Sequence, residues 1–156
     1  MPPKSTSITI QKAIEEDAPK LTDIALTAKR HWGYPEEWIA LWTEGLTISS
    51  AYILQNQVFT TVHEGKIIAF TALIQREDAY EIEHLWVLPE YTGLGIGQKL
   101  VLHLKSILFT LNTAGLKVIV VSDPNAVGFY QKMGATIVGA YESTPNKRML
   151  PILEFK

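Results

Sequence analysis

Three glycines stand at alternate positions within EHLWVLPEYTGLGIGQ, residues 83–98. Gly93, Gly95 and Gly97 come directly after a strand-like apolar run and directly before a stretch with helical spacing. Glycine lets successive backbone N–H groups turn toward one side, and the start of a helix adds a positive dipole end. The pattern favours a cradle for an anion, for which a diphosphate is the natural guest. The alternative is a tight turn with a close contact between helix and strand.

Two known phosphate-binding motifs do not fit these glycines. A P-loop requires G-x-x-x-x-G-K-[ST], and the sequence contains no such string. A dinucleotide fingerprint requires G-x-G-x-x-G, but Gln98 stands where the third glycine belongs. That fingerprint also needs an acidic residue about 20 positions later, which is absent. The glycines therefore indicate another kind of anion site.

Two segments carry a resemblance to a known family. LWVLPEYTGLGIGQKL resembles the acetyl-CoA-binding motif of the GNAT superfamily of N-acetyltransferases, which reads Gln or Arg, two residues, Gly, one residue, then Gly or Ala. Thr92 stands at the Gln or Arg position, so one hydroxyl donor replaces a guanidinium fork. SDPNAVGFYQKMGA, residues 122–135, resembles the family segment N-x-x-A/G-x-x-F-Y-x-K-x-G-F. The resemblance covers nearly the whole chain and is to single-domain bacterial members.

The resemblance implies acetyl-CoA as the cofactor, with Asn125 bordering its pantetheine arm. It implies direct attack by a primary amine of a small molecule or peptide in a ternary complex, and the absence of cysteine agrees because no thiol is available for a covalent intermediate. The implied oxyanion donors are the backbone N–H groups of Trp86, Val87 and Leu88. The predicted cofactor-binding residues are Leu85, Trp86, Val87, Thr92, Gly93, Leu94, Gly95, Ile96, Gly97, Gln98, Asn125, Phe129 and Tyr130.

The family tyrosine matches Tyr130, which we therefore assign as the general acid for the leaving thiolate. The alternative is that Tyr130 packs beside Phe129 with its hydroxyl bound to a backbone group. For the base, Glu81 and Glu83 share a strand face, and Glu83 is the better candidate because it is nearer the glycines. The alternative for both is a solvated strand face. Simple alternation places His84 on the opposite face, although a β-bulge would reverse this.

The segment KRHWGYPEEW, residues 29–38, is predicted to contact the acceptor. Its aromatic rings and neighbouring carboxylates suit a small cationic amine. Trp38 is better explained as part of a packed corner between helices, and Arg148 receives no role. The predicted substrate-binding residues are His31, Trp32, Tyr34, Glu81 and Glu83.

Hydrophobic spacing and turn residues predict the elements that position these groups. A mixed α+β sheet of about seven mostly antiparallel strands with about four helices follows, in the order β-α-α-β-β-β-α-β-α-β-β. Asp17 is expected to cap the first helix and Gly33 to end it. The expected strands are 7–13, 57–64, 66–76, 80–87, 116–121, 135–143 and 148–155, and the expected helices are 18–33, 35–45, 97–115 and 125–133, with a further turn at Ser49 or Ser50.

Composition limits the class of protein. The chain of 156 residues is predicted to form a single domain, residues 1–156. Its net charge of −2 lacks the basic excess of a nucleic-acid binder, and no segment reaches the ~18 to 20 apolar residues of a membrane span. No cysteine is present for a disulfide or a thiolate metal site, and we predict no metal site. We expect a cytoplasmic protein, and the resemblance suggests a possible homodimer.

Acetyl transfer to an amine is thus the function that the sequence predicts. The main alternative is a non-catalytic regulatory module of the same fold that binds CoA or acetyl-CoA, and Thr92 favours it. A scaffold whose exposed aromatic residues bind another protein is a third reading, and it would not bind acetyl-CoA.

Overall fold

The computed structural model describes residues 8–110, 116–143 and 147–155, and these contain one seven-stranded mixed sheet in the order β1-β2-β3-β4-β5-β7-β6. Neighbouring strands are antiparallel except for β4 and β5, which are parallel. This confirms the predicted α+β class and strand number. The strands are β1 (Ile8–Lys12), β2 (Gln57–His63), β3 (Lys66–Gln75), β4 (Ala79–Val87), β5 (Lys117–Val121), β6 (Ala135–Glu142) and β7 (Met149–Phe155).

The described residues form five α-helices, one more than the sequence predicts. The additional helix is α3 at the expected turn, where the Ser49 side chain accepts the Tyr52 backbone N–H at 3.0 Å. The predicted end at Gly115 of the 97–115 helix lies outside the described residues. No helix in the described part is long and apolar enough to cross a membrane. The helices are α1 (Ala18–His31), α2 (Glu36–Leu46), α3 (Ser50–Gln55), α4 (Ile96–Thr110) and α5 (Val127–Lys132).

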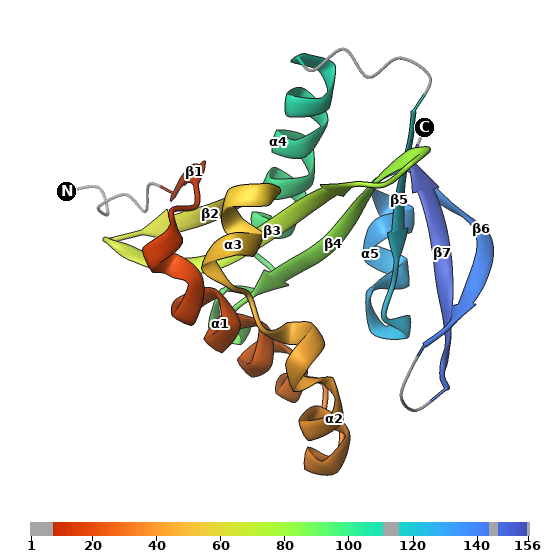
Figure 1. The fold of residues 1–156 in the computed structure, drawn as a ribbon, viewed down its shortest axis with the longest axis horizontal. Coiled ribbons are helices and arrows are strands. Elements are labelled where there is room, and N and C mark those ends of the chain that lie inside the picture. The colour runs from red at the N-terminus through yellow and green to blue at the C-terminus, as the bar shows by residue number, and fades with distance from the viewer. Residues whose placement is uncertain (1–7, 111–115, 144–146, 156) are drawn as a thin grey trace.

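Helices cover both faces of the sheet. Figure 1 shows α1 and α3 in front of strands β2 to β4, with α4 behind them. Leu21 and Ile24 of α1 pack with Phe70 of β3, and we call this cluster the α1 core. Leu104 of α4 and Tyr130 of α5 pack in the opposite cluster, the α4 core. Regular apolar spacing along α1 and α4 thus places each helix on its own face.

The start of α1 differs from the prediction. Asp17 has helical backbone angles and makes no side-chain cap bond to the helix. Its carboxylate instead accepts the backbone N–H of Ile14 at 3.0 Å, across a 3₁₀ turn that precedes α1 and is closed by the Asp17 N–H donating to the Ile14 carbonyl at 2.9 Å. Gly33 ends the helical segment as expected, at a φ of +84° that favours glycine.

A bulge in β4 changes which face its side chains occupy. Two consecutive residues of β3 pair with Ile82 and His84, so Glu83 is an extra residue on β4. Tyr80 and Ile82 pack in the α4 core, whereas Trp86 packs in the α1 core. The prediction from simple alternation, that these residues and His84 share one face, is therefore wrong beyond the bulge.

Strand β4 extends past the end of its pairing with β5. Within the described residues, the two strands pair only through residues 79–81 of β4, although β4 continues to Val87. Figure 1 shows the strands diverging from their paired ends. The outer edge of β4 from Ile82 onward is therefore open to a ligand.

Candidate active site

Two neighbouring cavities lie beside the open edge of β4. The glycine cavity has a volume of about 550 Å³ and is lined in part by Gly93, Gly95 and Asn125. The tryptophan cavity has a volume of about 770 Å³ and is lined in part by Trp42 and Asp123. Both cavities are lined by Trp32, Leu85, Trp86, Ala126 and Tyr130. Because the two cavities share these residues, a ligand in one cavity would lie next to a ligand in the other.

The glycines serve two different physical purposes. Gly93 and Gly95 have φ angles of +80° and +81°, which side chains disfavour. The Gly95 carbonyl accepts the Lys99 N–H at 3.0 Å, so α4 begins immediately afterward and its first N–H groups have no partner within the helix. Gly97 has an ordinary φ, but a Cβ there would lie 3.3 Å from the Phe129 ring. The first two glycines shape the loop that precedes α4, and the third lets α4 pack on α5.

The side chain of Thr92 does not extend the predicted anion cradle. Its hydroxyl donates to the Pro89 carbonyl at 2.9 Å, which occupies its single proton. The expected hydroxyl donor is therefore already used inside the loop. The groups left to face an anion at this loop are backbone N–H groups and the N-terminal end of α4.

Two of the three predicted oxyanion donors face β3 and are not available. The Leu88 N–H donates to the Ile68 carbonyl at 2.9 Å. Amides of an antiparallel strand alternate between facing the partner strand and facing away from it. In the register that pairs β4 with β3, Trp86 faces β3 as Leu88 does, and Val87 faces the open edge. The structure thus leaves Val87 as the donor aimed into the gap.

Tyr130 of α5 reaches the junction of the two cavities. Its side chain packs against Phe129 and Phe155, with ring centroids 5.1 and 6.1 Å away. Burial raises the pKa of Tyr130 above its ordinary value, so the hydroxyl keeps its proton at neutral pH. No described residue forms a hydrogen bond with that hydroxyl, so the alternative in which a backbone group holds it is not observed.

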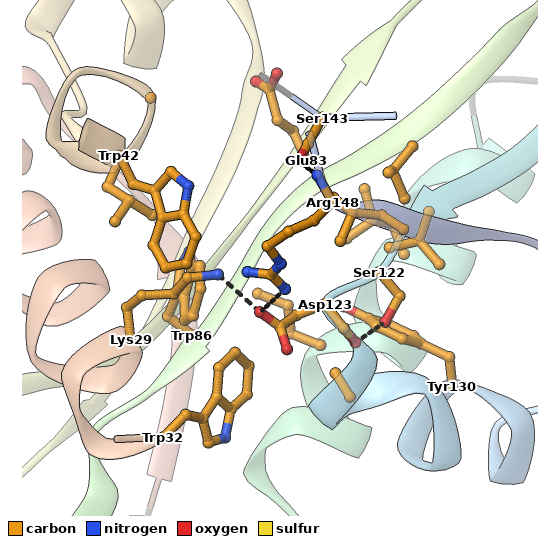
Figure 2. A pocket seen from close by; sticks show the side chains of 18 of the residues that line it. Lys29, Trp32, Trp42, Glu83, Trp86, Ser122, Asp123, Tyr130, Ser143 and Arg148 are labelled. Carbon is orange, nitrogen blue, oxygen red and sulfur yellow. Dashed lines mark hydrogen bonds and ion pairs between the residues drawn. The ribbon is translucent and has the colours of Figure 1, made fainter. Parts of the chain in front are cut away.

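An ionic cluster lies in the wall of the tryptophan cavity. Lys29 Nζ lies 2.8 Å and Arg148 Nη2 lies 3.4 Å from the same oxygen of Asp123. All three charged side chains are largely buried: Lys29 is 12% exposed, Arg148 is 16% exposed and Asp123 is 8% exposed. Figure 2 shows both cations converging on Asp123, with Trp32, Trp42 and Trp86 around them.

Tyr34 and Asn125 complete this cluster. The Tyr34 hydroxyl donates to Asp123 at 2.9 Å and accepts from Arg148 Nη2 at 3.1 Å. The Asn125 side-chain N–H groups donate to Tyr34 Oη at 3.1 Å and to Asp123 at 3.0 Å. Asn125 also lines the glycine cavity, so one network borders both cavities.

Burial and charge set the ionisation of the cluster. Burial alone would raise the pKa of Asp123, but the hydrogen bonds from the Lys29 side chain and the Asn125 backbone N–H hold that pKa below its usual value. Burial lowers the pKa of Lys29, the nearby Arg148 charge adds to this effect, and Asp123 opposes it. Asp123 is therefore the anion that allows two cations to lie together at this wall.

Glu83 also lines the tryptophan cavity. The Tyr52 hydroxyl donates to its Oε1, and Arg76 Nη2 lies 3.5 Å from its Oε2. Burial and the Glu83 carboxylate raise the pKa of Tyr52, so this hydroxyl remains a donor. The bulge and these two donors fix the Glu83 carboxylate at the cavity.

His84 is buried in the α1 core face and does not line either cavity. Its side chain is near the rings of Phe70 and Tyr52, and its Nδ1 accepts the Trp86 indole N–H at 3.0 Å. Burial lowers the pKa of His84 to about 4. The bulge does reverse its face, as the sequence allowed, but the imidazole supports Trp86 instead of entering a cavity.

A family comparison decides the class of the protein. The family model described as "Acetyltransferase (GNAT) family" matches residues 19–135. The chain belongs to the GNAT acetyltransferase family. It is therefore an acyltransferase that uses acetyl-CoA. A search of curated protein sequences finds no significant match.

Solved structures agree with this assignment. The chain is similar to a PaiA N-acetyltransferase from Thermoplasma acidophilum, solved in complex with coenzyme A, at 25% identity and a TM-score of 0.79 over 96% of this chain and 99% of that one. It shares its fold with an IAA acetyltransferase from Bacillus cereus, at 20% identity and a TM-score of 0.70 over 96% and 99% of the chains. It also shares the fold of the ribosomal-protein-S18-alanine N-acetyltransferase from Escherichia coli, at 19% identity and a TM-score of 0.67 over 96% and 93%.

The glycine cavity of this GNAT protein fits the elongated cofactor. Its loop offers unpartnered helix N–H groups to a diphosphate, and nothing lies within 4 Å of where a Cβ would stand at Gly93 or Gly95. The open edge of β4 offers backbone groups to an amide-containing arm. All predicted cofactor-binding residues except Leu94, which is 61% exposed, line this cavity.

The predicted acceptor residues separate in the structure. Trp32 lines both cavities, and Glu83 lines the tryptophan cavity. His31 lies instead on the glycine cavity. Tyr34 lines neither cavity and donates a hydrogen bond to Asp123, which lines the tryptophan cavity. Glu81 is bound by Arg76 at 2.9 Å and also lines neither cavity.

Sequence reasoning missed the ionic residues of the tryptophan cavity. The sequence assigns no role to Arg148, and it does not single out Lys29 and Asp123 within the predicted segments 29–38 and 122–135. One signal was present: Lys29 follows Ala25 by four positions on α1, and Ala25 is fully buried. That spacing predicts a lysine on the buried side of the helix.

We expect the His84 imidazole to titrate with a midpoint near 4 in the folded protein. In protein unfolded by urea, the same group should titrate near ~6.5. NMR of the imidazole protons measures both, and the His84→Gln variant assigns the signal. Because the unfolded chain binds the proton more readily, stability falls as pH is lowered from 6.5 to about 4, by up to ~1.4 kcal/mol per pH unit from this group. A folded-state midpoint near ~6.5 would contradict the burial of His84.

Proposed function

We propose that this protein transfers the acetyl group of acetyl-CoA to the primary amine of a small molecule or peptide by direct attack in a ternary complex. The observation that carries the proposal is the meeting of two cavities at Tyr130 and Trp86. The glycine cavity suits the cofactor, and the tryptophan cavity suits the acceptor. When bound, acetyl-CoA supplies the acetyl group as an activated thioester.

Tyr130 is the proposed general acid. Its buried hydroxyl keeps its proton and lines both cavities, where the thiolate leaves and the acceptor enters. A hydroxyl without a described partner is free to donate to a departing sulfur. A correctly placed acid typically contributes ~10² to 10⁴ in rate.

The Val87 amide is the proposed donor to the oxyanion. It faces the gap where β4 separates from β5. A backbone donor of this kind is worth ~3 to 4 kcal/mol in the transition state. Because it belongs to the strand, its position depends on the register of β4 with β3.

Glu83 is the proposed proton acceptor for the amine. Its carboxylate lines the tryptophan cavity, and Tyr52 fixes its orientation. Proton transfer goes from the ammonium of the acceptor to Glu83, directly or through one water. Glu81 is a weaker candidate because Arg76 holds it outside both cavities.

A regulatory module that only binds CoA is the second candidate. The occupied hydroxyl of Thr92 favours it, because this loop offers the diphosphate no side-chain donor at that position. The tryptophan cavity argues against it, because a module that only binds the cofactor needs no second cavity beside Tyr130.

Release of free CoA from acetyl-CoA tests the proposed function. The protein should be assayed with a panel of amino acids, peptide N-termini, polyamines and aminoglycosides. We expect release that depends on one of these amines. A folded protein that binds acetyl-CoA but releases none across the panel would support the regulatory module instead.

We expect Tyr130→Phe to lower kcat by at least ~100-fold, because the ring packing stays and the proton donor is lost. Steady-state CoA release measures the loss, and thermal unfolding checks that the fold is retained. Tyr141→Phe is the matched control, because Tyr141 is 51% exposed on β6. Near-normal turnover of Tyr130→Phe would remove Tyr130 from the mechanism.

We expect Glu83→Gln to lower kcat/KM by ~100-fold near neutral pH, since the amide keeps a hydrogen bond to Tyr52 but accepts no proton. The loss should shrink as pH rises, because more of the amine is already deprotonated in solution. A pH profile of kcat/KM measures this, with the exposed Glu142→Gln as control. A loss of equal size at every pH would indicate that Glu83 only positions the acceptor.

A further inference from the structure

The ionic cluster in the wall of the tryptophan cavity carries an excess of positive charge. Lys29 and Arg148 share the single carboxylate of Asp123, so this cluster has a net charge of about +1 at neutral pH. Two further carboxylates, those of Glu83 and Glu44, line the cavity outside this cluster. Glu83 is bound by Tyr52 and Arg76, and Glu44 is exposed on α2.

Arg148 has donors left to offer. Among the described residues, only its Nη2 forms side-chain hydrogen bonds, to Tyr34 and Asp123. Its guanidinium carbon lies 4.8 Å from the Tyr34 ring centroid and 5.0 Å from that of Trp42, so the group is held in place between two aromatic rings. A guanidinium fixed in this way is suited to bind a carboxylate through paired N–H groups.

Lys29 lies on the same wall, and aromatic rings surround its ammonium group. Its Nζ is 4.4 Å from the Trp42 centroid and 5.6 Å from the Trp32 centroid. Two cations held this close in a partly buried wall repel each other, and one carboxylate offsets only one of them. A second carboxylate, brought by a ligand, would balance the cluster.

We propose that the acceptor is an amine that also carries a carboxylate, as an amino acid does, and that Arg148 and Lys29 bind this carboxylate. The proposal rests on the proposed amine acetylation and names its substrate class. The carboxylate lies against the ionic cluster, the amine faces Glu83 and Tyr130, and the carbon skeleton packs on Trp32, Trp42 and Trp86. Each charged end of a zwitterion then meets an opposite charge.

The same charges disfavour an acceptor that is only cationic. A polyamine or a free amine without an anion would bring further positive charge to Lys29 and Arg148. Like charges in a partly buried site oppose binding, and such repulsion is a common source of specificity.

Matched pairs of acceptors test the carboxylate. CoA release should be measured for α-amino acids with aliphatic and aromatic side chains, for ω-amino acids of increasing length, and for the primary amide of each. We expect the best carboxylate to exceed its own amide by ~10- to 100-fold in kcat/KM, the range for a hydrogen bond to a charged group.

Substitution of Arg148 separates recognition from folding. Arg148→Gln should lower kcat/KM for the carboxylate by ~10- to 100-fold and change it little for the matched amide. Arg30→Gln is the control, because Arg30 pairs with Glu36 and lines neither cavity. Equal losses for both acceptors would mean that Arg148 only maintains the cavity, and this would overturn the proposal.

A measurement of binding without turnover separates the proposed acceptor class from the proposed acetyl transfer. Fluorescence of the cavity tryptophans, recorded with CoA present, should report binding of the amino acids and not of their amides. If the amino acids bind and are not acetylated, the substrate-class inference survives as a binding site and the proposed transfer fails. If polyamines are acetylated in preference to every carboxylate, the transfer stands and the inference falls.

Discussion

The site of this protein depends on the point where β4 stops pairing with β5. Backbone N–H and C=O groups require partners when they are buried, so a strand whose edge becomes open must meet water, a loop or a ligand. Here β4 runs on to Val87 beyond its last pair with β5. The two cavities border the freed edge, and the amide of Val87 is available because no second strand takes it. Closing this gap with further pairing would remove both the donor and the space.

The bulge at Glu83 makes this open edge useful. With regular pairing in place of the bulge, His84 and Trp86 would keep the face of Tyr80 and Ile82 in the α4 core. With the bulge, Trp86 turns to the α1 core, and Glu83 itself lines the tryptophan cavity. One irregular residue thus supplies a cavity wall and a carboxylate. This agrees with the tendency of bulges to lie near functional sites and redirect side chains.

The sequence predicts the strands, the main helices and the glycine cavity because these depend on local patterns. Alternation, helical spacing and glycine at positive φ can each be read within about fifteen residues. It fails at β4, where alternation gives no sign of a bulge, and at Thr92, whose hydroxyl is used by a carbonyl three residues away. It also misses the ionic cluster, whose Lys29 and Asp123 are 94 residues apart. A pair this distant in the chain leaves no periodic signal.

The cofactor half and the acceptor half of the site are built from different parts of the chain. The cofactor half relies on backbone groups and glycines from one short segment, so it leaves a motif that a family shares. The acceptor half takes side chains from α1, α2, β4, the turn after β5 and the start of β7. Lys29, Trp42 and Arg148 lie outside both family segments, so they can change without disturbing the loop that precedes α4. Proteins at 19–25% identity therefore retain the fold, and the fold alone does not fix the charges that face the acceptor. The acceptor must be inferred from Lys29, Asp123 and Arg148 themselves, since family membership constrains the cofactor and leaves this wall open.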